Sequence, residues 1–277
     1  MEWWQSILLG IVQGLTEFLP VSSSGHLMIT KAILGVDGEG FLDFTVLVHL
    51  GTVCSTLVVF RKEILSLFAG LFKFRYNDET DYVLKLVVSM IPVAFVGLVM
   101  KDFVEGLFGE SLFVVAVSLV VTAMLLFFSD RVSAGRRALK EQDAEGPRNG
   151  ISYWQAFVVG IGQAFAVAPG LSRSGTTIAV GLLSGVKREV IAQFSFLMVL
   201  VPILGEQLLS VAGGLSEGGS IFGEEVSAVS LALGFAFSFL SGLFACKVMI
   251  ALVKRAKLIW FALYCAAVAL LILLLGV

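Results

Sequence analysis

Long apolar runs without a single charge are the feature that most constrains this chain. Residues 111–128 and 258–277 contain no Asp, Glu, Lys or Arg. A helix needs about 20 predominantly apolar residues to span a bilayer, and these runs approach or reach that length. The composition agrees, because 14% of the 277 residues are charged, against roughly 25% in soluble domains. The sequence therefore predicts an all-α polytopic membrane protein.

Two kinds of apolar segment can be distinguished. Six uninterrupted segments are expected to cross the membrane as full transmembrane helices: 42–60, 83–100, 111–129, 191–211, 227–250 and 258–277. Two further segments, 5–30 and 154–183, are interrupted by Pro, Gly and Ser. Since Pro cannot continue a helix without losing a hydrogen bond, each of these two is expected to break near its middle.

Loop charges orient the crossings, because short cytoplasmic loops collect Lys and Arg. Two loops that contain several Lys and Arg residues are predicted to be cytoplasmic: 61–82 and 130–152. Two loops with an acidic excess are predicted to be external: 101–110 and 212–226. Segment 154–183 starts from a cytoplasmic loop and ends beside basic residues, so it must enter and leave on the same side. The sequence therefore predicts a re-entrant helical hairpin there.

The two interrupted segments match each other at a fixed offset of 150 residues. Six of the sixteen positions from 10 to 25 are identical in the second copy: Gly10 and Gly160, Ile11 and Ile161, Gln13 and Gln163, Ser22 and Ser172, Ser24 and Ser174, Gly25 and Gly175. Three crossings separate the copies, and an odd number inverts the second copy in the membrane. We expect an inverted-topology repeat with about six full transmembrane helices and two re-entrant helical hairpins.

This repeat predicts the domain organisation. Residues 1–277 form a single membrane domain, with repeat one at 1–130, a cytoplasmic loop at 131–152 and repeat two at 153–277. The two hairpins enter from opposite sides, so their tips are expected to meet near the bilayer midplane, where such folds place substrate sites.

Where the two copies differ, their polar side chains complement each other. Glu17, Ser23 and His26 of the first copy correspond to Val167, Arg173 and Thr176 of the second. One interpretation is a structural salt bridge between Glu17 and Arg173 that locks the hairpins, because charges at bilayer depth need a partner. The other interpretation is an oxyanion receptor.

Several features favour the receptor. The guanidinium of Arg173 suits phosphate oxygens, and each second half-helix aims its N-terminus at the same point. Eight further residues are predicted to contact phosphate: Gln13, Ser22, Ser24, Gly25, Ser172, Ser174, Gly175 and Thr177. Ser23 and His26 share a helix face at i and i+3, so they are candidates for nucleophile and proton carrier. His49 lies mid-span and is interpreted as a core residue.

These residues carry a family resemblance. The pattern Gln13-x-x-x-Glu17, followed by Pro-Val-Ser-Ser-Ser-Gly-His26 and later by Pro169-Gly-Leu-Ser-Arg173-Ser-Gly-Thr-Thr177, resembles the bacterial undecaprenyl-diphosphatase (bacitracin-resistance) family. The resemblance implies a hydrolase that converts undecaprenyl diphosphate to undecaprenyl phosphate and inorganic phosphate. This reaction recycles the lipid carrier for peptidoglycan and cell-wall synthesis, and the family is associated with bacitracin resistance. It also implies a bacterial cytoplasmic (inner) membrane protein with its active site facing the periplasm.

The residues predicted to be catalytic are Glu17, Ser23, His26 and Arg173. The resemblance further implies a divalent cation, Mg²⁺ or Ca²⁺, between Glu17 and the phosphates. The family accepts Glu or Gln at the first motif position, and Gln13 removes one negative charge there. The attacking group is left open between Ser23, His26 and water.

The expected partners are a polyprenyl diphosphate lipid and membrane lipids, a homodimer is left open, and no basic stripe suggests nucleic acid. The alternative function is a lipid-phosphate transporter or flippase that uses the same site, because inverted repeats with broken helices are typical of secondary transporters.

Overall fold

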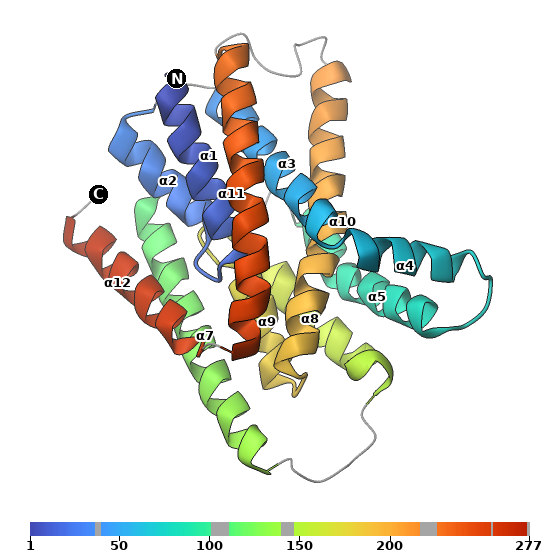
Figure 1. The fold of residues 1–277 in the computed structure, drawn as a ribbon. Coiled ribbons are helices and arrows are strands. Elements are labelled where there is room, and N and C mark those ends of the chain that lie inside the picture. The colour runs from blue at the N-terminus through green and yellow to red at the C-terminus, as the bar shows by residue number, and fades with distance from the viewer. Residues whose placement is uncertain (37–39, 101–110, 140–146, 217–225, 256, 276–277) are drawn as a thin grey trace.

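A computed structural model of the chain describes residues 1–36, 40–100, 111–139, 147–216, 226–255 and 257–275. Within these ranges the chain forms helices and connecting turns and contains no strand (Figure 1). The helices are α1 (Trp3–Phe18), α2 (Ser23–Leu34), α3 (Gly40–Val59), α4 (Arg61–Leu71), α5 (Asp78–Val99), α7 (Leu112–Leu139), η1 (Arg148–Gly150), α8 (Tyr153–Phe165), α9 (Arg173–Leu183), α10 (Arg188–Ser216), α11 (Ala228–Arg255) and α12 (Ile259–Leu275). The predicted all-α class is confirmed.

Each of the six predicted crossings coincides with a helix. Four of the described helices, α5, α7, α10 and α11, are long and apolar enough to cross a membrane alone. Helix α3 meets this test only together with α4, from which it is bent by 71°. Helix α12 has 17 residues, or about 26 Å at 1.5 Å per residue, somewhat less than the roughly 30 Å hydrocarbon core. A polytopic membrane protein is confirmed, and the number of six crossings stays a prediction.

Two predicted loops are partly helical. Residues 61–82 were expected to form a loop, but they contain α4, which leaves the end of α3 in a new direction (Figure 1). The predicted loop 131–152 begins inside α7, which continues to Leu139. Arg, Ala and Leu are strong helix formers, so this helix does not end where its apolar run ends. Loop 101–110 and most of loop 212–226 lie outside the described residues.

Helices α1 and α2 form the first hairpin. Helix α1 ends at Phe18 because Leu19 precedes a proline and adopts an extended backbone, as residues before proline prefer. Helix α2 then starts behind Ser22, whose side chain accepts a hydrogen bond from the Gly25 N–H at 3.2 Å. Ser22 has a φ of 71°, which is costly for a non-glycine residue. The first tip is therefore a sharp, capped turn.

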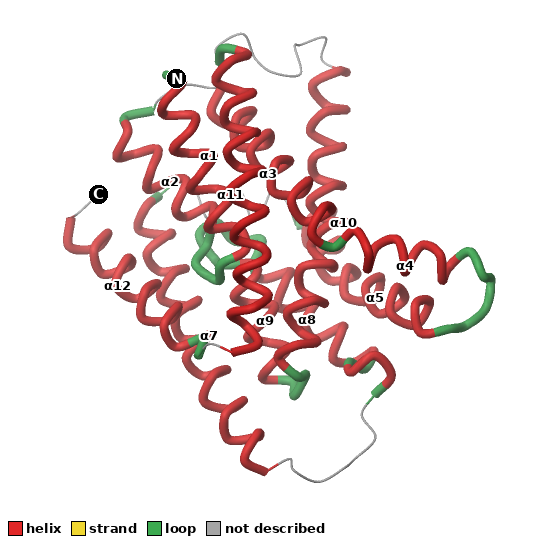
Figure 2. Tube along the Cα trace, viewed as in Figure 1, coloured by secondary structure: helices red, strands yellow, loops and turns green. Residues whose placement is uncertain are grey.

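Helices α8 and α9 form the second hairpin in the same way. Gly170, with a φ of 81°, turns the chain, and a Cβ there would lie 2.8 Å from the Val115 Cα. Ser172 caps α9 by accepting from the Gly175 N–H at 3.1 Å. Figure 2 shows both tips as loops in the middle of the helix bundle. The two predicted breaks are confirmed.

Matching glycines bring each hairpin close to a helix of the other half. A Cβ on Gly10 of α1 would lie 2.5 Å from the Gly234 carbonyl oxygen of α11, and a Cβ on Gly160 of α8 would lie 2.2 Å from the Ser89 carbonyl oxygen of α5. Small residues allow such close backbone packing between membrane helices. These paired contacts agree with the inverted repeat, which as a whole stays a prediction.

A buried charge network fixes the start of the second hairpin against α5. Lys85 is 2% exposed, and its Nζ donates to Asp81 Oδ2 at 2.5 Å and to the Arg148 carbonyl at 2.7 Å. Asn149 also donates to Asp81, at 2.9 Å. Buried charges are tolerated when they are paired and fully hydrogen-bonded. The network therefore holds the segment that leads into α8.

Candidate active site

Glu17, in the last turn of α1, is the centre of the site. Its Oε2 accepts hydrogen bonds from the Ser23 hydroxyl at 2.6 Å and from Gln13 Nε2 at 2.9 Å. Gln13 is one helical turn earlier, so both side chains lie on one face of α1. Ser23 comes back from the first turn of α2, which the Pro20 break folds against the end of α1. The carboxylate is 10% exposed.

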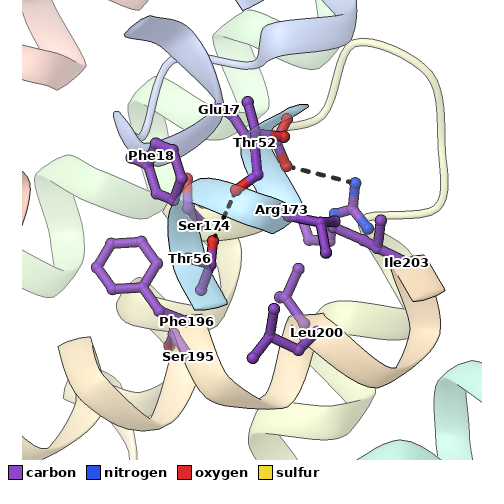
Figure 3. Close-up of a pocket in the computed structure, with 12 residues that line it drawn as sticks. Glu17, Phe18, Thr52, Thr56, Arg173, Ser174, Ser195, Phe196, Leu200 and Ile203 are labelled. Carbon is purple, nitrogen blue, oxygen red and sulfur yellow. Dashed lines mark hydrogen bonds and ion pairs between the residues drawn. The ribbon is translucent and has the colours of Figure 1, made fainter. Parts of the chain in front are cut away.

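Arg173 brings the opposite charge from the other hairpin. It is the first residue of α9, and its Nη2 lies 3.7 Å from Glu17 Oε1 (Figure 3). The Arg173 side chain is 27% exposed, more than the Glu17 side chain. The prediction that Glu17 and Arg173 meet across the two tips is confirmed. The arginine therefore keeps surface that a phosphate oxygen can contact.

Four of the other predicted phosphate ligands, all serines, either cap a half-helix or join the two tips. Ser22 and Ser172 cap their own helices. Ser24 Oγ accepts from the Gly170 N–H at 3.4 Å, and Ser174 Oγ donates to the Leu19 carbonyl at 3.1 Å. The abundance of hydroxyls in the sequence is thus explained first by the architecture of the tips. Their role as phosphate ligands stays a prediction.

Contacts within each tip also involve Thr177 and the two glycines that match between the repeats, Gly25 and Gly175. A Cβ on Gly25 would lie 3.1 Å from Ser22 Oγ, and a Cβ on Gly175 would lie 2.9 Å from Ser172 Oγ. Both N–H groups are taken by these caps. Thr177 Oγ1 donates to the Arg173 carbonyl at 3.0 Å. The N–H groups of the residues that precede these glycines in each half-helix have no acceptor within the helix.

His26 points toward α12, and its two ring nitrogens have other partners. Nδ1 lies 2.8 Å from the Ser22 carbonyl oxygen, and Nε2 lies 2.8 Å from the hydroxyl of Tyr264, whose ring stacks on the imidazole. A carbonyl can only accept, so Nδ1 carries the hydrogen. Ser23, by contrast, turns back to Glu17. The described contacts therefore do not pair His26 with Ser23, although they share a helix face.

His49 is the residue that sequence reasoning missed. Its Nε2 lies 3.7 Å from Glu17 Oε2, so the interpretation of His49 as a core residue outside the site is wrong. A signal was present, because Thr45, His49, Thr52 and Thr56 recur at helical spacing in an otherwise apolar helix and so form one polar face.

A small cavity lies beside Glu17 and Arg173 (Figure 3). Residues of α1, α3, α9 and α10 line it: Glu17, Phe18, Thr52, Val53, Thr56, Arg173, Ser174, Ser195, Phe196, Val199, Leu200 and Ile203. Its volume of about 30 Å³ is enough for a water molecule but too small for a diphosphate head group. Ser195 is 1% exposed, and its hydroxyl has no hydrogen-bond partner in the described part of the chain.

The described residues fit a divalent cation only if phosphate oxygens of the substrate supply further ligands. Among the described residues no group of three His, Cys, Asp or Glu side chains converges. Gln13 Oε1, however, is buried without a hydrogen-bond partner next to the Glu17 carboxylate. Mg²⁺ commonly binds through one or two protein oxygens together with phosphates and waters. Glu17 and Gln13 could supply those two oxygens.

Comparison with known proteins assigns the family. Residues 6–271 match the sequence model of the bacitracin resistance protein BacA family. An undecaprenyl-diphosphatase from Parabacteroides distasonis is 52% identical over 96% of this chain and 95% of the relative. One from Bacteroides thetaiotaomicron is 50% identical over 99% of both chains, and one from Christiangramia forsetii is 45% identical over 98% and 97%. The chain therefore belongs to the bacitracin resistance protein family.

Proposed function

We propose that the chain is an undecaprenyl-diphosphate phosphatase, which hydrolyses undecaprenyl diphosphate to undecaprenyl phosphate and inorganic phosphate. Relatives of this name match nearly the whole chain at 45–52% identity. The reaction recycles a lipid carrier for cell-wall synthesis. The observation that carries the proposal is the 2.6 Å hydrogen bond from Ser23 to Glu17 with Arg173 opposite: a hydroxyl nucleophile, its base and a phosphate ligand in one place.

Ser23 is the proposed nucleophile. Glu17 takes its proton as Oγ attacks the terminal phosphorus, and undecaprenyl phosphate leaves. Water then cleaves the phosphoserine and releases inorganic phosphate. Ser23 is favoured over His26 because its hydroxyl already donates to a carboxylate, whereas Nε2 of His26 is paired with Tyr264.

Arg173 stabilises the phosphoryl oxygens during transfer. Catalysis of phosphoryl transfer depends mostly on positioning and on charges placed where the transition state is negative. The first-turn N–H groups of α2 and α9 add positive partial charge, which also favours a bound phosphate. A divalent cation, when bound by Glu17 and Gln13, would supply further neutralisation of the phosphates. The lipid tail stays in the membrane while the head group enters between the hairpins.

We place the protein in the bacterial cytoplasmic membrane with the site accessible from the periplasmic side. The loop charges support this, since segments 61–82 and 130–152, which contain several Lys and Arg residues, are expected to be cytoplasmic. The first hairpin enters from the side opposite to these loops and carries Glu17 and Ser23.

Phosphate release from undecaprenyl diphosphate in detergent micelles tests the proposal, because hydrolysis needs no second compartment and lipid transport does. The wild type should release phosphate, and quench-flow should trap a phosphoserine. Ser23→Ala should lose both, with turnover falling by about 10⁴-fold or more. Thr30→Val, which removes an α2 hydroxyl bonded to the His26 carbonyl, is the matched control. Near-normal turnover in Ser23→Ala would exclude the serine route.

A further inference from the structure

The residue that precedes the proposed nucleophile has a strained backbone. Ser22 has a φ of 71°, which is uncommon for any residue other than glycine. Such a conformation persists only where its surroundings hold it in place. The next residue is Ser23, whose hydroxyl donates to Glu17 Oε2 at 2.6 Å. The direction of the Ser23 side chain therefore depends on what fixes the Ser22 turn.

His26 holds this turn at its carbonyl group. The Ser22 carbonyl belongs to the peptide group that joins Ser22 to Ser23. Its oxygen accepts from the His26 backbone N–H at 3.1 Å, as in any helix, and it also lies 2.8 Å from the ring Nδ1 of His26. Because a carbonyl only accepts, Nδ1 donates this second hydrogen bond. The imidazole therefore fastens the peptide group next to the nucleophile.

Tyr264 of α12 holds the same imidazole from its other side. Its hydroxyl lies 2.8 Å from His26 Nε2, and its ring stacks on the imidazole with the centroids 5.6 Å apart. The neighbouring Cys265 Sγ donates to the Pro20 carbonyl at 3.6 Å, so two successive residues of α12 contact the first tip. Helix α12 packs on α7. These contacts give the imidazole a fixed support outside its own hairpin.

We propose that Tyr264 is a positioning residue for the reaction, an inference that rests on the proposed hydrolysis through Ser23. Tyr264 acts through the imidazole of His26, which holds the Ser22 carbonyl and with it the direction of the Ser23 hydroxyl. His26 then serves the reaction as a hydrogen-bond donor to the backbone and not as a proton carrier. A contact that merely attached α12 to α2 would affect stability and leave the chemical step unchanged.

Removal of the Tyr264 hydroxyl tests this role most directly. Tyr264→Phe keeps the stacked ring, and we expect kcat and the single-turnover rate of phosphoserine formation to fall by about 2- to 10-fold, the scale of one hydrogen bond. KM should stay near the wild-type value. Quench-flow and steady-state phosphate release in micelles measure these quantities. Tyr82→Phe, which removes the same group from a tyrosine of α5 that lines a different cavity, is the matched control and should be neutral.

Thermal unfolding in detergent separates positioning from stability. The positioning role predicts a slower chemical step in a Tyr264→Phe variant that remains folded at the assay temperature. A lower unfolding temperature with wild-type kcat and phosphoserine formation would mean that Tyr264 only anchors α12, and would overturn the proposal.

Two variants of His26 test whether its ring acts as a donor. In His26→Asn the side-chain amide can still donate to the Ser22 carbonyl, but it cannot carry a proton. His26→Ala has no donor, and misplacement of a reacting group by about 1 Å can cost about 100-fold in rate. We expect a loss of about this size in His26→Ala and of at most about tenfold in His26→Asn. Equal losses in the two variants would contradict the donor role and overturn the proposal.

The combined variant shows whether Tyr264 acts through His26. If it does, Tyr264→Phe should cause no further loss in the His26→Ala background, because the group that the hydroxyl holds is already absent. Losses that multiply would give Tyr264 a separate role and overturn the proposal.

The positioning role and the hydrolysis can fail separately. If Ser23→Ala loses turnover while Tyr264→Phe behaves as the wild type, only the positioning role is wrong. If Ser23→Ala itself turns over normally, the serine route is wrong, and the positioning role falls with it.

Discussion

The two hairpin tips share a scaffold and differ in chemistry. The positions that match between them make the turns: Ser22 and Ser172 cap the half-helices, and glycines three residues later leave room for the cap hydroxyls. The positions that differ supply the central groups of the site, because Glu17 of the first tip contacts both Ser23 of its own tip and Arg173 of the second. The comparison teaches that the identical serines and glycines build the turns, whereas the divergent positions supply the charged groups and the nucleophile; Gln13 is an identical position that also contacts the site.

Gln13 and Gln163 show the same contrast at one matching position. Gln13 donates to Glu17 at 2.9 Å. Gln163 is 1% exposed, and neither of its amide atoms has a hydrogen-bond partner in the described part of the chain. Its counterpart of Glu17 is Val167, which cannot accept a hydrogen bond. A buried amide without partners is costly, so Gln163, unlike Gln13, lacks a described contact that would offset its burial.

The largest expected effect comes from the divergent position Arg173. Arg173→Lys keeps the charge but loses the planar fork that contacts two oxygens, and removal of one transition-state donor typically costs 10²–10³-fold in kcat. We expect a loss of about this size in micellar phosphate release. Arg61→Lys, at an exposed arginine, should be neutral. Near-normal turnover in Arg173→Lys would show that the guanidinium has no bidentate role.

The matching glycines should affect stability to a similar extent in both tips. Gly25→Ala and Gly175→Ala place a Cβ about 3 Å from the cap hydroxyls, and overpacking of this kind costs about 1–3 kcal/mol. Thermal unfolding in detergent should report both losses. Gly97→Ala, where nothing lies within 4 Å of the added Cβ, should be neutral or slightly stabilising. A loss of stability in only one of the two variants would show that the two tips are not structurally equivalent.

The smallest expected effect distinguishes the two glutamines. Gln13→Leu removes a hydrogen bond to a charged group and should lower kcat/KM by about tenfold. Gln163→Leu should leave turnover unchanged and should be neutral or stabilising, because it removes an unsatisfied buried amide. Equal losses of activity in the two variants would mean that Gln163 also serves the reaction.

Prediction from sequence succeeded where a local signal determines the structure. Pro20, the Ser caps and the glycines specify both breaks, and charge-free runs specify the membrane helices. It failed where long-range contacts decide. Helix α4 was not predicted for a local reason, because the charged residues at its start are also typical of a loop.

The roles of individual polar side chains were the least predictable. Ser174 bonds to Leu19, a residue 155 positions earlier, and His26 bonds to Tyr264, 238 positions later. The approach of His49 to Glu17 depends on how α3 packs beside α1. None of these contacts is encoded by spacing within one segment.

The central claim is that the two tips form one catalytic unit, and a double-mutant cycle tests it most directly. Turnover would be measured for Glu17→Gln, Arg173→Lys and the combined variant. Residues that act as a unit are strongly non-additive, so the combined variant should be little worse than the poorer single variant. Losses that multiply would show that Glu17 and Arg173 act independently, and would contradict a shared site.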